Sequence, residues 1–217
     1  MPDRQRFRLQ PDRRLAFLQG FLKHPKTVGS IIPSSRFLER RVTRVARVAQ
    51  ARLVVELGPG TGGTTRALLR AMAPDATLLC VEINPDFVRI LRTLGDPRLR
   101  VHAGSAADLS GILAEQGLPA PDVIVSGIPF STMPGSVGLA VLKGAWAALP
   151  PGGAFVAYQV RDRVEMLGRR VMGPADVELE LRNVPPMRVY RWRKEAPPRQ
   201  GTAEESAAER PLAGPVA

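Results

Sequence analysis

The chain has 217 residues, a length that suits one α/β domain with a sizeable core. Its formal net charge is +11, and the first 52 positions hold thirteen Lys and Arg residues against three acids. A basic segment beside a nearly neutral remainder favours a polyanionic partner, either a nucleic acid or an anionic membrane surface. The single cysteine excludes an internal disulfide and a cysteine-ligated zinc site, and we expect no metal.

The sequence contains no candidate membrane span and no secretion signal. No apolar run approaches the roughly 20 residues that cross a bilayer, and the N-terminus lacks an apolar stretch followed by a small-residue cleavage site. We therefore expect a cytoplasmic protein that reaches a membrane only from its surface.

The first predicted element is a basic amphipathic helix over 12–25, where leucines at helical spacing are flanked by phenylalanines and cations. We expect it to lie on anionic lipid, although its apolar face would also suit packing on the domain. Its membrane-binding residues would be Arg13, Arg14, Leu15, Phe17, Leu18, Phe21, Leu22, Lys23 and Lys26. A second helix over 34–49 begins at a serine cap, and we assign 1–50 to these N-terminal helices.

Strands and helices then alternate along the chain. The apolar runs at 52–58, 76–83, 99–104, 121–128 and 153–160 predict strands, and the segments 63–73, 85–95, 107–116 and 135–149 predict helices. Five strands separated by helices indicate a parallel, doubly wound sheet.

The end of the domain follows a different pattern. Residues 176–194 read as two alternating strands joined at 183–186, and strands without an intervening helix pair antiparallel. A doubly wound α/β sheet that closes with such a hairpin is typical of the Rossmann-like class I methyltransferase fold, which we place at 51–195. Residues 196–217 are rich in Pro, Ala and Glu, and we expect a disordered tail.

The stretch VVELGPGTGG at 54–63 places four glycines within six residues, directly after an apolar strand. Gly58, Gly60 and Gly63 fit the dinucleotide pattern G-x-G-x-x-G. Ending on Gly62 instead gives G-x-G-x-G behind an acid, which is typical of S-adenosylmethionine sites. Pro59 removes a backbone N–H that a pyrophosphate would need, so the residues favour the second interpretation.

Two acids agree with a cationic nucleoside cofactor. Glu56 precedes the loop, where a carboxylate suits the sulfonium and amino groups of S-adenosylmethionine. Glu82 ends the next strand, where a carboxylate can accept both ribose hydroxyls.

These residues carry a family resemblance. The stretches VVELGPGTG, VEINPDF and SGIPF resemble S-adenosylmethionine-dependent methyltransferases related to the rRNA adenine dimethylases. The segment FLKHPKTVGSIIPSSRFLERR at 21–41 is more similar to the bacterial phospholipid N-methyltransferases than to any other branch. The resemblance spans 17–194.

The resemblance implies a set of cofactor-binding residues. They are Gly29, Ser30, Ser34, Ser35, Glu56, Gly58, Gly60, Gly62, Thr64, Glu82, Ile83, Ser105, Ala106 and Ser126. The N-terminal members would close over the cofactor. Ser105 stands where related enzymes often present an Asp to the adenine, so adenine recognition departs from the family pattern.

The resemblance also locates the acceptor site at 126–130. Adenine dimethylases typically carry Asn-Leu-Pro-Tyr here, and this chain has Ser126, Gly127, Ile128, Pro129 and Phe130. The missing amide removes a group that reads a base edge. We expect the Ile128 carbonyl to hold the acceptor amine, and Phe130 and Tyr158 to stabilise the methylammonium by cation–π attraction.

We therefore predict stepwise N-methylation of phosphatidylethanolamine toward phosphatidylcholine, on the inner face of the cell membrane, with S-adenosyl-L-homocysteine as the second product. Phosphatidylethanolamine and its methylated intermediates, together with an anionic membrane surface, are the expected partners. One alternative is an rRNA adenine N6-methyltransferase, which the basicity favours. Against it, dimethylases carry a helical RNA-binding domain after the sheet, and we expect only a tail here. A further alternative is a non-catalytic adaptor that binds membrane or RNA.

Overall fold

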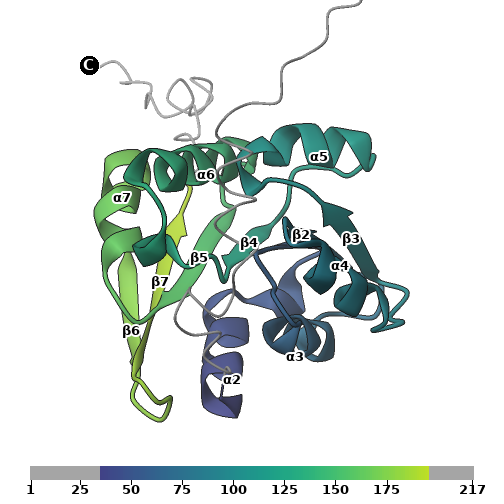
Figure 1. The fold of residues 1–217 in the computed structure, drawn as a ribbon, viewed down its shortest axis with the longest axis horizontal. Coiled ribbons are helices and arrows are strands. Elements are labelled where there is room, and N and C mark those ends of the chain that lie inside the picture. Colours follow the sequence, from purple (N-terminus) through teal and green to yellow (C-terminus); the bar gives the residue numbers. More distant parts are fainter. Residues whose placement is uncertain (1–34, 196–217) are drawn as a thin grey trace, which may run out of the picture.

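The structure, a computed structural model, describes residues 35–195. Within this range seven strands form one sheet in the order β3-β2-β1-β4-β5-β7-β6. Strands β1 to β5 are parallel to one another, whereas β7 runs antiparallel to both β5 and β6. This topology confirms the predicted class I methyltransferase fold with its C-terminal hairpin (Figure 1). The helix predicted over 12–25 and the predicted tail lie outside the described residues.

The strands fall within the predicted apolar runs, shortened at their ends. They are β1 (Leu53–Leu57), β2 (Thr77–Glu82), β3 (Leu99–Ala103), β4 (Val123–Ser126), β5 (Ala154–Gln159), β6 (Asp176–Glu180) and β7 (Met187–Arg193). The helices are α2 (Arg36–Val45), α3 (Gly63–Ala71), α4 (Pro85–Arg92), α5 (Leu109–Glu115), α6 (Gly135–Ala148) and α7 (Arg163–Met172). Short 3₁₀ turns occupy Val48–Gln50, Ala106–Asp108 and Phe130–Thr132.

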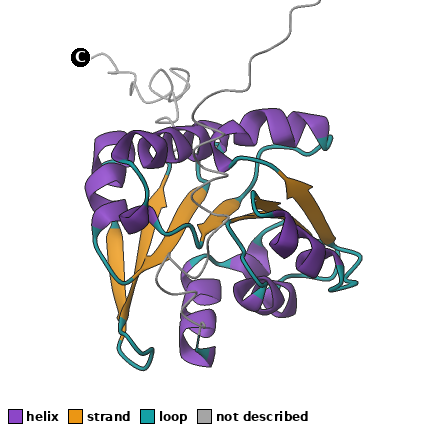
Figure 2. Ribbon diagram, viewed as in Figure 1, coloured by secondary structure: helices purple, strands orange, loops and turns teal. Residues whose placement is uncertain are grey.

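Helices cover both faces of the sheet (Figure 2). Alternate side chains of β1 divide between two cores: Val54 joins the core under α2, α3 and α4, and Val55 joins the core under α5, α6 and α7. Every residue of β1 is buried, as expected for a central parallel strand covered on both sides. The central strands are therefore fixed, and their carboxyl ends form a rigid edge for a binding site.

Two elements differ from the sequence-based expectation. The helix predicted over 34–49 ends at Val45, because Arg47 takes a left-handed conformation with φ 52° and a 3₁₀ turn follows. Helix α7 was not predicted at all. It buries Val164, Leu167 and Gly168 against the sheet, and the indole ring of Trp192 lies so close to Gly168 that a Cβ atom there would approach it to 2.7 Å.

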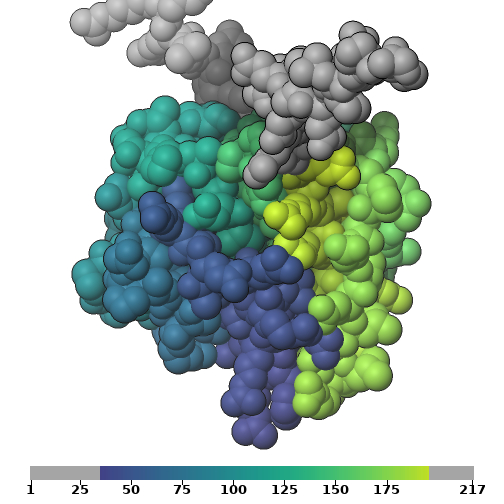
Figure 3. All heavy atoms as spheres, turned by 180° about the vertical axis from the view of Figure 1, so that it is seen from behind, coloured from purple at the N-terminus to yellow at the C-terminus, as the bar shows by residue number. Residues whose placement is uncertain are grey.

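Helix α2 packs directly on the β6–β7 hairpin (Figures 1 and 3). The Arg41 guanidinium donates to Glu180 at 2.9 Å and to Glu178 at 2.8 Å. Arg182 also binds Glu180, and these two guanidinium groups lower the pKa of the buried Glu180 carboxyl to about 2. At the start of α2, the backbone N–H of Ser35 donates to the amide oxygen of Asn183. None of the helices in 35–195 is long and apolar enough to cross a bilayer.

The Glu180 cluster predicts acid sensitivity. Because the pKa of this carboxyl falls from its ordinary 4.5 to about 2 on folding, its contribution is complete above pH 4.5 and is lost as the pH falls toward 2. The shift corresponds to up to about 3 kcal/mol of unfolding free energy. We expect Glu180→Gln to lower stability at pH 7 and to remove this part of the acid dependence, measured by urea unfolding from pH 7 to 2. Glu165→Gln, at an exposed i,i+4 pair with Arg169, is the matched control and should change stability by under about 0.5 kcal/mol. Parallel pH profiles for wild type and Glu180→Gln would contradict the assignment.

Candidate functional site

The carboxyl ends of the parallel strands bring most of the predicted site residues to one edge of the sheet. Glu56 lies near the end of β1, Glu82 ends β2, Ser126 ends β4 and Tyr158 lies near the end of β5. Ser105 follows β3 by two residues. Ligands of open α/β sheets bind at this edge, where the strand order reverses, and here the reversal lies between β1 and β4.

The glycine loop takes a conformation that requires its glycines. Gly58, Gly60 and Gly62 all have positive φ, at 67°, 58° and 83°. A Cβ atom on Gly58 would also lie 2.8 Å from Cγ1 of Ile128, so the loop packs closely against the segment after β4. The backbone N–H of Gly58 donates to the Val81 carbonyl at 3.0 Å, which fixes the loop to β2.

Glu82 ties this loop to the next crossover. Its Oε2 accepts from the backbone N–H of Gly60 at 3.0 Å, and its Oε1 accepts from the N–H of Asn84 at 2.8 Å. Burial raises the pKa of this carboxyl, while the backbone donors at Asn84, Gly60 and Ile83 oppose the rise. The carboxylate is therefore held in one orientation at the end of β2. Each of its oxygens has a second lone pair that can accept from a hydroxyl.

Glu56 is fully buried between β1 and α3. Its Oε2 accepts from the Thr65 hydroxyl at 2.6 Å and from the Cys80 thiol at 3.4 Å. Its Oε1 has no hydrogen-bond partner within residues 35–195. Removal from water raises the pKa of this carboxyl to about 7.

The residues present fit S-adenosylmethionine. A buried acid with an unsatisfied oxygen costs free energy that a nearby cationic ligand would offset. The loop after β1 leaves open space at Gly60, where a Cβ atom would meet no other atom within 4 Å. The edge thus combines the buried carboxyl of Glu56, an open glycine turn at Gly60 and the Glu82 carboxylate, which can accept from hydroxyl groups.

The remaining predicted cofactor residues differ in their surroundings. The Ser105 hydroxyl accepts from the backbone N–H of Ala107 at 3.3 Å and caps a 3₁₀ turn, in which Ala106 is buried. Ile83 is half-buried beside Glu82. Ser35 caps α2 by accepting from Leu38 N–H, while Gly29, Ser30, Ser34 and all nine predicted membrane-binding residues lie outside the described residues.

The segment 126–130 differs from the predicted acceptor geometry. The Ile128 carbonyl accepts from the Phe130 backbone N–H at 2.9 Å and from the Gln159 amide at 2.8 Å, so its two lone pairs are engaged within the chain. Phe130 is fully buried in the core beneath α6, because the turn after Pro129 directs its ring inward. Ser126 is also buried, with its hydroxyl 3.4 Å from Ile128 N. In this conformation neither the Ile128 carbonyl nor the Phe130 ring faces an acceptor, and Ile128 and Pro129 remain half-exposed.

With the Ile128 carbonyl and the Phe130 ring turned away, Tyr158 supplies a polar side chain at this edge of the sheet. Its hydroxyl lies 2.9 Å from the hydroxyl of Thr64 in α3. A Cβ atom on Gly127 would lie 2.6 Å from the same hydroxyl and 2.9 Å from the Gly58 carbonyl, so a side chain at position 127 is excluded. Burial raises the pKa of the Tyr158 phenol, which therefore stays neutral at physiological pH.

Sequence reasoning missed three contributors to this edge and the packing role of a fourth residue, Gly127. Thr65 holds Glu56, Asn84 orients Glu82, Gln159 fixes the Ile128 carbonyl, and Gly127 makes room for Tyr158. Gln159 carried a signal, because it is a polar residue at the end of an apolar strand. The roles of the other three residues depend on contacts that are visible only in three dimensions.

Comparison with known proteins adds a lipid-modifying relative. The chain is 33% identical over 177 residues to an ornithine lipid N-methyltransferase of Singulisphaera acidiphila, and the match covers 80% of this chain and 92% of that protein. It is also similar to ribosomal RNA small subunit methyltransferase A, with 31% identity in Kineococcus radiotolerans and 32% in Paraburkholderia xenovorans. These two matches cover 72% and 54% of this chain but only 52% and 39% of those proteins. No family model matches the chain.

Solved structures share the fold at low sequence identity. An O-methyltransferase from Bacillus cereus in complex with S-adenosylhomocysteine superposes with a TM-score of 0.60 at 14% identity, over 86% of this chain and 94% of that one. TomG from Streptomyces achromogenes, in complex with S-adenosylmethionine, gives 0.58 at 17% identity, over 87% and 92%. From the extended match to the lipid enzyme and the shared fold, the chain belongs to the S-adenosylmethionine-dependent bacterial phospholipid and related lipid N-methyltransferases, a family related to the rRNA adenine dimethylases.

Proposed function

We propose that the protein transfers methyl groups to the primary amine of phosphatidylethanolamine, stepwise toward phosphatidylcholine, at the surface of a membrane. The observation that carries this proposal is the match along 92% of a lipid N-methyltransferase, against about half or less of the two rRNA methyltransferases. Both kinds of enzyme act on nitrogen, so the acceptor side of the site must favour the lipid.

The proposed cofactor site uses the residues at the carboxyl edge of β1 and β2. When bound there, S-adenosylmethionine supplies a methyl group on a positively charged sulfur. Glu82 accepts from the ribose hydroxyls, and the turn at Gly58, Gly60 and Gly62 leaves room for the amino-acid portion. The buried charge of Glu56 favours the cation from below the loop. Ser105 is the member of this set closest to the family's adenine-binding position.

The acceptor side of the site depends on Tyr158 in this proposal. When its hydroxyl donates to Thr64, the phenolic oxygen accepts a hydrogen from the amine and directs the nitrogen lone pair. The raised pKa of this phenol argues against a phenolate base, so Tyr158 orients the amine without removing its proton. Gly127 has no side chain to read a nucleobase, and any larger residue there would collide with Tyr158.

A second acceptor, ornithine lipid, is favoured by the relative from Singulisphaera acidiphila. Its headgroup also presents a primary amine, so the same orienting hydroxyl would serve. Peripheral binding through the segment 12–26 is part of the proposal. A non-catalytic adaptor does not account for the buried Oε1 of Glu56, which has no hydrogen-bond partner within residues 35–195.

Labelled-methyl transfer tests the substrate. The purified full chain is offered vesicles of phosphatidylethanolamine, vesicles of ornithine lipid and deproteinised rRNA in parallel. We expect label in phosphatidylethanolamine and in its mono- and dimethylated products. Label only in ornithine lipid would replace the substrate and keep the lipid class, whereas label only in rRNA would overturn the proposal.

Removing the two acids should weaken cofactor binding in different ways. Glu82→Ala loses the paired hydrogen bonds of a carboxylate, worth about 1.5–3 kcal/mol, so affinity should fall roughly ten- to a hundredfold. For Glu56 the pH matters, because the carboxyl is half-ionised near pH 7 and only its ionised form attracts a cation. Wild-type affinity should therefore rise as the pH increases through about 7, and Glu56→Gln should remove this dependence.

Calorimetric titration with S-adenosylhomocysteine and S-adenosylmethionine from pH 6 to 8 measures both effects. Glu115→Gln, at an exposed position on α5, is the control and should leave affinity and its pH profile unchanged. The folded state of the free protein also holds the Glu56 proton more tightly than the unfolded chain. Its stability should therefore decline between pH 4.5 and 7 in the wild type but not in Glu56→Gln. Equal pH profiles for wild type and Glu56→Gln would remove Glu56 from the site.

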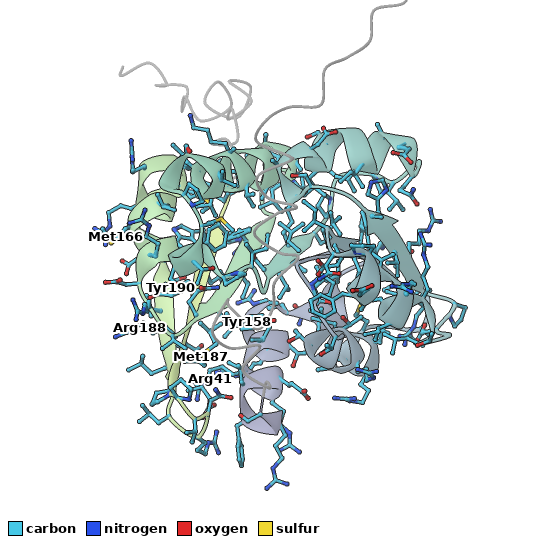
Figure 4. All side chains as sticks on the ribbon, viewed as in Figure 1. Arg41, Tyr158, Met166, Met187, Arg188 and Tyr190 are labelled. Atoms are coloured by element: carbon cyan, nitrogen blue, oxygen red, sulfur yellow. The ribbon has the colours of Figure 1, made fainter. Side chains whose placement is uncertain are left out.

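The Tyr158 hydroxyl should matter for turnover and not for cofactor affinity. Tyr158→Phe keeps the ring and removes the group that orients the amine, so we expect kcat to fall about tenfold or more. Tyr190→Phe is the matched control, since its buried hydroxyl has no partner within 35–195 and lies on β7 (Figure 4). Full activity of Tyr158→Phe would exclude this role.

A further inference from the structure

Strand β6 presents its apolar side chains to solvent and two of its three acids, Glu178 and Glu180, to the protein. Val177, Leu179 and Leu181 are 45%, 52% and 70% exposed, whereas Glu180 is buried and Glu178 turns toward α2. A strand at the surface of a soluble domain normally has the opposite arrangement. The apolar row continues into the loop 181–186, where Val184 is 89% exposed.

The charges around this loop are positive. Two of the three acids of β6 are paired with arginines, Glu180 with Arg41 and Arg182, and Glu178 with Arg41 and Arg44. The third, Asp176, is exposed at the end of the strand away from the loop. The loop 181–186 contains no acid, and the nearby exposed side chains Arg36, Arg40, Arg182 and Arg188 are cationic. The tip of the hairpin therefore combines apolar side chains with a surrounding basic surface.

The exposed side chains stand on a fixed loop. Asn183 is its buried member: its amide oxygen accepts from Ser35 N–H at 3.0 Å, and its amide nitrogen donates to the Pro185 carbonyl at 2.9 Å. The Arg182 guanidinium lies 4.3 Å from the centre of the Phe37 ring. The loop is thus attached to the start of α2 through Arg182 and Asn183, while its apolar residues Leu181 and Val184 stay exposed.

The loop lies at the same edge of the sheet as the candidate site. Because β7 runs antiparallel to β5, Arg188 at its start pairs with Gln159 at the end of β5. The loop before β7 therefore projects from the carboxyl edge, where Glu82, Ile128 and Tyr158 also lie. The hairpin and α2 lie side by side in Figure 1, and their atoms form one continuous surface in Figure 3.

We propose that the loop 181–186 docks on an anionic lipid bilayer, with Leu181 and Val184 entering the interface and the arginines of the hairpin and α2 contacting lipid phosphates. This inference rests on the proposed lipid substrate and adds an orientation. A bilayer bound here faces the carboxyl edge of the sheet that carries the candidate site, so a headgroup amine need not leave the membrane surface. A basic rim around exposed apolar side chains matches an anionic interface and opposes pairing with a second copy of the same cationic tip.

Vesicle sedimentation tests the loop itself. The full chain and its Leu181→Ser/Val184→Ser variant are mixed with vesicles containing phosphatidylglycerol or with neutral phosphatidylcholine vesicles, at low and high salt. Met166→Ser is the matched control, because Met166 is 59% exposed on α7 and lies apart from Arg41 of α2 and from Met187, which directly follows the loop (Figure 4). Thermal unfolding of each variant confirms that it is folded, and methylation of detergent-dispersed phosphatidylethanolamine reports the site separately.

We expect the loop variant to bind anionic vesicles about tenfold more weakly than the wild type, with salt weakening both. Its methylation of dispersed lipid should equal that of the wild type, and Met166→Ser should match the wild type in both assays. Equal vesicle binding by the loop variant would overturn the docking inference and leave the proposed substrate standing. A lipid-free dimer that the loop substitutions dissociate would also overturn it, by assigning the loop to a second copy of the chain. Weaker vesicle binding without any methylation of lipid by the wild type would keep the docking surface and reject the proposed substrate.

Discussion

The site depends on the two backbone hydrogen bonds that the Glu82 carboxylate accepts. One comes from Gly60 in the loop after β1 and the other from Asn84 at the start of α4. A single side chain thereby links two crossover connections, in addition to the bond from the Gly58 N–H to the Val81 carbonyl that fixes the loop to β2. Because the same carboxylate is the predicted ribose ligand, the group that shapes the empty loop is also the group that would read the cofactor.

The pKa values of the two most buried acids of the domain are shifted in opposite directions. Glu180 meets two arginines, so its pKa falls to about 2 and it contributes to the attachment of α2. Glu56 meets a hydroxyl and a thiol, so desolvation dominates and its pKa rises to about 7. The difference separates a structural acid, which is satisfied within the protein, from an acid whose second oxygen has no hydrogen-bond partner within residues 35–195.

The architecture was largely predictable, because runs such as LVVEL and TLLCVE bury both faces of a strand and only a parallel sheet accommodates several of them. Helix α7 was not predicted because Gly168 interrupts its apolar pattern. A Cβ atom at position 168 would collide with the Trp192 ring of β7. The motif at 126–130 located the right edge, yet it could not show that Phe130 turns inward or that Gln159 occupies the Ile128 carbonyl. For the hairpin, the alternation in DVELE predicted a strand, but it did not predict which of its side chains face solvent. The facing depends on Arg41 and Arg44, which lie more than 130 residues earlier.

The close approach of Gly127 to the Tyr158 hydroxyl makes these two positions interdependent in evolution. Any side chain at 127 displaces the phenol, and loss of the phenol at 158 leaves an unfilled space beside a bare glycine. Placing a side chain at 127 therefore requires a simultaneous change at 158, because either single change passes through a clash or a cavity. The shape of this part of the edge is thereby set by the pair and not by either residue alone.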